Sequence, residues 1–172
     1  MQYETFHTIH RLMKESGVME DVGGFWNTLS VLYFPLDRFM RCPMFRPVQG
    51  GTLREDLVVS YFHGPRDKIS VFIMEIERRE FEGRPTEWND ALVHLTGYSL
   101  EIREKQEKRH AHRMLYAAMA IGRHVRFYQL RPGASTLEDL PGTNQSESPY
   151  EIKDNENEIH EILSGLGANC AQ

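Results

Sequence analysis

Apolar residues recur along this chain at two different spacings, and each spacing predicts a type of element. Residues 55–62 and 69–77 are runs rich in Val, Ile and Phe, which is typical of β-strands. The sequence Gly-Pro-Arg-Asp at 64–67 separates these runs and predicts a hairpin. From Trp88 to Ile102, apolar residues instead recur every three or four positions, which predicts a helix that Thr86 caps.

The rest of the chain adds helices on both sides of these strands. In chain order we expect a helix over 4–16, a short helix over 25–34, an irregular strand near 44–48, a helix through 114–122, a strand over 124–130, a loop over 131–149 and a helix over 155–166. This order predicts an α/β or α+β fold in which helices pack on a mixed β-sheet. With 172 residues, the chain is expected to form a single domain over 1–166, followed by a flexible tail over 167–172.

Composition narrows the possible classes of function. The formal net charge is −5, whereas proteins that bind nucleic acid usually carry a basic surface, so nucleic acid is a disfavoured partner. No apolar run is long enough to span a membrane, and the first residues lack a basic region followed by an apolar one. We therefore expect an intracellular protein, cytoplasmic or nuclear, without a membrane partner. Cys42 and Cys170 are far apart in the sequence and are not expected to form a disulfide.

Three acidic residues on the two strands of the predicted hairpin are the main candidates for chemistry. Glu75 and Glu77 are two positions apart, so they share one face of a strand. If Asp56 on the preceding strand lies opposite them, three carboxylates converge. Carboxylates that are so close need a cation or protons between them.

The succession of motifs around these residues resembles the PD-(D/E)XK nuclease-like superfamily, and in particular its small fungal members. In this chain, "LYFPLDRF" and "CPMFRPVQGGTLREDLVV" resemble the segment that leads into the family's first acidic strand, and "VFIMEIERRE" resembles the family's (D/E)XK strand. "EWNDALVHLTGY" is similar to the helix that follows that strand in the family, and "YAAMAIGRHVRFYQL" is similar to the family's last core helix and strand. Together these motifs span roughly residues 25–130. The resemblance implies a restriction-endonuclease-like mixed sheet flanked by helices.

The resemblance also implies roles for individual residues. Asp56 falls on the metal-binding aspartate and Glu75 on the acidic residue of the second motif, and in the family these carboxylates hold Mg²⁺ or Mn²⁺ for phosphodiester hydrolysis. The family's lysine falls on Glu77 and its glutamine on His94. A glutamate in place of the lysine reverses a charge beside an anionic substrate. We therefore expect weak or lost hydrolysis.

Other interpretations of the same residues stay open. A third carboxylate could recruit a second metal, or Arg78 or Lys105 could supply the missing cation, and either would preserve hydrolysis. Alternatively, the chain is an isomerase- or cyclase-like enzyme of a fungal biosynthetic pathway, whose small-molecule substrate undergoes acid–base chemistry at the same four residues without a metal. A pocket of several hundred cubic ångströms beside the carboxylates would favour that enzyme. A flat surface would favour a non-catalytic interaction module, which could form a homodimer.

Overall fold

The computed structural model describes residues 19–47, 53–62, 67–106, 110, 112–145 and 148–170, without the side chains of 19–21, 44–47 and 53–56. The helix predicted over 4–16 lies outside these residues. The described part of the chain forms a seven-stranded sheet with three α-helices. In chain order the elements are α2 (Met19–Tyr33), β1 (Phe39–Pro47), β2 (Leu53–Phe62), β3 (Lys68–Glu77), a 3₁₀ turn (Arg79–Phe81), α3 (Pro85–Lys105), β4 (Leu115–Ile121), β5 (His124–Leu130), β6 (Glu138–Asp139), β7 (Tyr150–Glu151) and α4 (Glu156–Cys170).

The sheet is mixed because α3 crosses it between two parallel strands. β1, β2 and β3 pair antiparallel in chain order, with an irregularity between Val59 and Ser60. α3 then returns the chain so that β4 pairs parallel with β3. β4 and β5 form an antiparallel hairpin, and the short strands β6 and β7 both pair with β5. The predicted fold class, a mixed sheet with helices packed on it, is confirmed.

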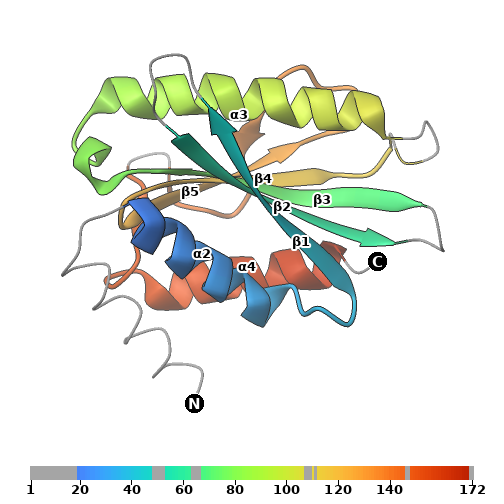
Figure 1. Cartoon of the computed structure of the whole chain (residues 1–172), viewed down its shortest axis with the longest axis horizontal. Coiled ribbons are helices and arrows are strands. Elements are labelled where there is room, and N and C mark those ends of the chain that lie inside the picture. The colour runs from blue at the N-terminus through green and yellow to red at the C-terminus, as the bar shows by residue number, and fades with distance from the viewer. Residues whose placement is uncertain are drawn as a thin grey trace.

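Helices cover both faces of this sheet (Figure 1). α3 lies on one face, and its residues Ala91 and Leu95 belong to a core with Ile73 of β3. α2 and α4 lie on the other face, where Met74 of β3 joins the larger core. Because side chains alternate along a strand, neighbouring residues of β3 face different helices. A polar residue on β3 therefore lies under α3 or under the α2–α4 layer according to its position.

Residues 115–121 form a strand, so the helix predicted there is wrong. β4 lies inside the sheet between β3 and β5. Ala118 and Ala120 face the α2–α4 core, whereas Ala117 and Met119 face the α3 core. A strand buried on both faces is apolar at nearly every position, and such a run also satisfies a helical spacing. The pattern was therefore ambiguous, and burial by both layers decided it.

The boundaries of the helices also differ from the predictions, and α2 begins at Met19 rather than at residue 25. α3 begins at Pro85 and no side chain caps it, so the predicted cap by Thr86 is wrong. Proline suits the first turn of a helix because the N–H that it lacks has no partner there. α4 continues past Leu166, its predicted end, to Cys170, whose side chain is buried in the α2–α4 core. Burial of this last turn explains why the helix extends beyond its prediction.

Candidate functional site

Two glutamates at the end of β3 are buried beneath α3. Glu75 is 4% exposed and Glu77 is 6% exposed. They follow Ile73 at intervals of two, so they lie on the face of the sheet that α3 covers. Carboxylates are rarely buried to this degree in proteins without a specific partner or role. This pair is therefore the strongest candidate for chemistry in the described part of the chain.

The strand register places Asp56 directly opposite Glu75. β2 and β3 are antiparallel, and Asp56 pairs with Glu75 at the backbone. Opposed residues of antiparallel strands have Cα atoms about 4.5–5.5 Å apart and belong to the same face of the sheet. The side chain of Asp56 itself lies outside the described residues. At the level of the backbone, the hairpin brings together the two positions that the family resemblance assigns to the metal.

The position of His94 on α3 does not favour a contact with these carboxylates. The buried stripe of α3 consists of Ala91, Leu95 and Ser99, which recur every four residues. His94 precedes Leu95 by one position, about 100° around the helix, and it is exposed. The sequence interpretation of His94 as an acid–base partner of Glu75 therefore has no support from its position.

An arginine on β5 lies in the same row of the sheet as Glu75. The register runs from Glu75 to Met119 on β4 and then to Arg126 on β5. The guanidinium carbon of Arg126 lies 5.4 Å from the centre of the Trp88 ring, near the start of α3. Two strand spacings separate the backbones of Arg126 and Glu75, which is about 9.6 Å. Among the described side chains, Arg126 is thus a cation that the strand register places in the row of Glu75, and the sequence did not single it out.

The two cations that the sequence suggested lie elsewhere. Lys105 is in the last turn of α3, at the end of the helix far from Trp88, and it pairs with Glu101 at 2.5 Å. Arg78 directly follows Glu77, but its guanidinium lies 3.6 Å from the carboxylate of Glu80. Both side chains are also substantially exposed. Both charges are thus paired with glutamates at the surface in this structure.

A second acidic residue stabilises the loop at the same end of the sheet. Glu82 Oε1 accepts a hydrogen bond of 2.6 Å from the backbone N–H of Arg123, in the turn between β4 and β5. The Nε atom of Arg123 lies 3.5 Å from the same oxygen, and Nδ1 of His124 lies 4.0 Å away. The N–H of Gly122 in this turn donates to the backbone oxygen of Glu77. Glu82 therefore holds the β4–β5 turn against the end of β3.

The donor set suits a hard divalent cation better than zinc. Carboxylate oxygens are the ligands that Mg²⁺ and Mn²⁺ prefer, and Mg²⁺ is commonly held by one or two carboxylates together with waters. The strand register pairs the backbones of Asp56 and Glu75, two residues of the carboxylate type, on adjacent strands. Among the described side chains, no group of three or more His, Cys, Asp and Glu residues has the geometry of a metal site. That set does not include the side chain of Asp56.

Comparison of this chain with protein-family models, with curated proteins and with solved structures finds no match. The geometry of the site therefore carries the functional argument. In the residues that the structure describes, no helix combines the length and apolarity needed to cross a membrane.

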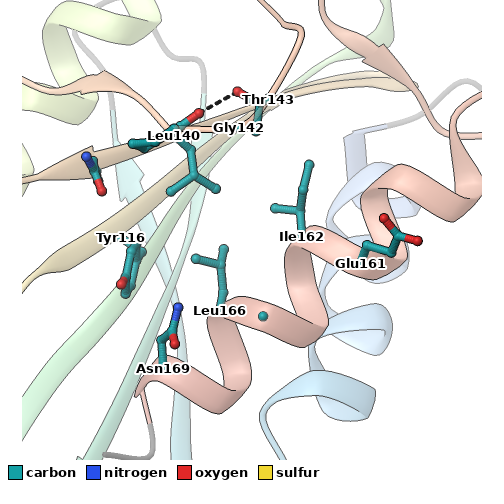
Figure 2. A pocket seen from close by; sticks show the side chains of 11 residues that line it. Tyr116, Leu140, Gly142, Thr143, Glu161, Ile162, Leu166 and Asn169 are labelled. Carbon is teal, nitrogen blue, oxygen red and sulfur yellow. Dashed lines mark hydrogen bonds between the residues drawn. The ribbon is translucent and has the colours of Figure 1, made fainter.

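A pocket of about 420 Å³ lies on the opposite face of the sheet (Figure 2). Tyr116 of β4, which lines it, alternates with Ala117 and Met119 of the α3 core and therefore faces α4. The sheet thus separates this pocket from Glu75 and Glu77. A small molecule in the pocket would not contact either carboxylate.

Proposed function

We propose that this chain is a nuclease-fold protein of the PD-(D/E)XK type in which Asp56 and Glu75 bind Mg²⁺ or Mn²⁺ and phosphodiester hydrolysis is weak or lost. The observation that carries the proposal is the register of β2 and β3, which pairs Asp56 with Glu75. The burial of Glu75 and Glu77 on one face of a mixed sheet supports it. The motif order that the sequence shares with the family supports it as well.

The charge at position 77 explains why hydrolysis is expected to be weak. A lysine about 4 Å from a developing phosphorane charge stabilises that charge by about 4 kcal/mol at an effective dielectric constant of 20. A glutamate at the same distance destabilises it by a similar amount. Among the described side chains, Arg126 is an alternative cation in this row of the sheet. Its backbone lies two strand spacings from that of Glu75, and its guanidinium lies over the ring of Trp88. Arg126 therefore compensates only in part.

Metal binding is the first test of this proposal. Calorimetric titration with Mg²⁺ and Mn²⁺ should show binding to the wild type and its loss in Glu75→Ala and in Glu75→Gln. The second variant keeps the size of the side chain and separates the loss of a ligand from the loss of packing. Glu104→Ala, at an exposed position of α3, is the matched control and should bind as the wild type does. Absence of binding to the wild type would refute the metal site.

Restoring the lysine is the second test. Glu77→Lys should raise Mn²⁺-dependent cleavage of single- or double-stranded DNA about tenfold or more, because it replaces a repulsive charge with an attractive one. Glu104→Lys makes the same change of net charge at an exposed site and should leave cleavage at the wild-type level. If Glu77→Lys binds metal but cleaves no faster, Glu77 does not occupy the position of the family's lysine.

The alternative of a small-molecule acid–base enzyme at the carboxylates needs a pocket beside Glu75. The described pocket of about 420 Å³ opens on the other face of the sheet and therefore does not serve these carboxylates. The net charge of −5 and the buried carboxylates still disfavour nucleic acid as a tight-binding partner. If the wild type binds no metal in the titrations, the acid–base interpretation of the carboxylates would be favoured over the nuclease one.

A further inference from the structure

The pocket of about 420 Å³ lies between α4 and the outer part of the sheet. Tyr116 and Leu140 stand on one side of it, and Ile162, Leu166 and Asn169 of α4 stand on the other (Figure 2). Pockets that bind small molecules enclose about 300–1,000 Å³, are mostly apolar and carry a few convergent polar groups. This pocket meets that description in size, and its lining combines apolar and polar groups in about equal measure.

The polar groups of the pocket sit at defined positions. Tyr116 and Asn169 both line the pocket, and burial raises the pKa of Tyr116. Gln129 is only 6% exposed, and its Nε2 donates to Oε1 of Glu138 at 2.5 Å. This bond fixes the orientation of the amide and leaves its carbonyl oxygen as an acceptor. The pocket therefore offers uncharged donors and acceptors that are already oriented.

The charge around the pocket selects against anions. Its lining residues include Glu161 but no Lys, Arg or His. A separate recess of about 210 Å³ on the other side of Tyr116 and Asn169 is lined by His112 and Arg113. The guanidinium of Arg113 is engaged there over the ring of Tyr61, with 5.5 Å to the ring centre. An anion in the larger pocket would meet the field of Glu161 without a cation to offset it.

One wall of the pocket is a glycine with open space in front of it. A Cβ atom added to Gly165 of α4 would meet no other atom within 4 Å. Gly165 lines the pocket, so a larger side chain at this position can enter it without displacing the protein. The same substitution removes the cost of a glycine within a helix. This position therefore allows the pocket to be filled while the fold is kept.

We propose that this pocket is a binding site for a small neutral or cationic molecule that has an apolar ring system and a short hydrogen-bonding tail. The ring packs between Leu140, Ile162 and Leu166, and the tail reaches the amides of Gln129 and Asn169. This site is independent of the carboxylates on the other face of the sheet. It requires neither a divalent cation nor phosphodiester chemistry.

The test uses three probes that share an indole ring and differ in the charge of the tail: tryptamine, tryptophol and indole-3-acetate. Titration of the ¹⁵N-labelled full chain, followed by NMR, reports binding through the side-chain amide signals of Gln129 and Asn169. Tryptamine and tryptophol should bind with dissociation constants of about 1 mM or below and shift these signals. Indole-3-acetate should bind about twofold to fivefold more weakly because it adds a negative charge on the side of the exposed carboxylate of Glu161.

Two matched variants locate the binding. Gly165→Leu fills the pocket and should weaken tryptamine binding about tenfold or more. Gly97→Leu makes the same change on α3, where an added Cβ also meets no atom within 4 Å, and it should leave binding unchanged. Thermal melts of both variants check the fold, and the map of shifted signals in the wild type locates the site even if Gly165→Leu fails to fold. Any of four results would overturn the proposal. Two concern the probes: no binding by tryptamine and tryptophol, or binding of indole-3-acetate that is as tight as that of tryptamine or tighter. The other two concern the site: amide signals of Gln129 and Asn169 that do not shift, or tryptamine binding that Gly165→Leu leaves unchanged.

Discussion

The β4–β5 turn supplies the sharpest prediction about stability, because one glycine and one carboxylate there compete for the same space. Gly122 has φ of +57°, and it is the first residue of the two-residue turn between Ile121 and His124. A Cβ atom at this position would lie 2.7 Å from Cγ and Cδ of Glu82 and closer still to Oε1. Substitution of Gly122 by alanine must therefore strain the backbone and also displace Glu82.

The two costs can be estimated separately. An L-residue in the left-handed region costs about 1–2 kcal/mol. Displacing Glu82 breaks its hydrogen bond from the N–H of Arg123, and a hydrogen bond to a charged group in a site that is 16% exposed is worth about 1.5–3 kcal/mol. Gly122→Ala should therefore lower the free energy of unfolding by about 2.5–5 kcal/mol. In a Glu82→Ala background the obstruction is absent, and the same substitution should cost only about 1–2 kcal/mol.

The four proteins of this cycle are the wild type, Gly122→Ala, Glu82→Ala and the double variant. Their urea unfolding, followed by tryptophan fluorescence, measures the coupling between positions 122 and 82. Trp26 is 1% exposed and reports the global transition. Gly133→Ala is the control for backbone strain alone, because Gly133 has φ of +75° and no atom within 4 Å of an added Cβ. It should cost about 1–2 kcal/mol. Equal costs of Gly122→Ala in both backgrounds, within about 0.5 kcal/mol, would refute the role given to Glu82.

Two further predictions concern buried polar groups. Nε2 of His110 lies 3.0 and 2.9 Å from the two carboxylate oxygens of Asp67, and both residues are 7% exposed. Asp67→Asn should therefore lower the free energy of unfolding by about 2 kcal/mol, measured by urea unfolding at pH 7. A variant as stable as the wild type would contradict this prediction. Burial raises the pKa of Tyr128 from 10.0 to about 12. The folded state thus holds the phenolic proton more tightly, and the stabilisation is complete below pH 10 and is lost as the pH rises toward 12. Between pH 9 and 11 the wild type should lose about 1.4 kcal/mol more stability than Tyr128→Phe, and equal losses would contradict the shift.

The central strands could be predicted from the sequence because their signals are local. β2, β3 and β5 each combine β-branched and aromatic residues within about ten positions, and short turns separate them from their partners. Close spacing along the chain also makes the β2–β3 hairpin the simplest pairing. The opposition of Asp56 and Glu75 follows from that pairing. This part of the candidate site was therefore accessible from the chain alone.

Burial on both faces removed the local signal elsewhere. β4 is apolar at nearly every position, so its sequence fits a strand and a helix equally well until both layers are in place. The extension of α4 to Cys170 also depends on burial in the α2–α4 core rather than on a local signal. His94 was assigned a role from its place in a motif, but the rotation of α3 on the sheet leaves it exposed.

The sequence by itself determined which residues form the hairpin and that acidic side chains occupy adjacent positions on it, because pairing between neighbouring segments depends on short-range patterns. Only the tertiary structure decided that Arg126 lies in the row of Glu75 and that Tyr116, Gln129 and Asn169 surround one pocket. These residues come from segments far apart in the chain, and the parallel register of β3 and β4 and the docking of α4 bring them together. No local pattern encodes such a register, because it results from packing all the layers at once.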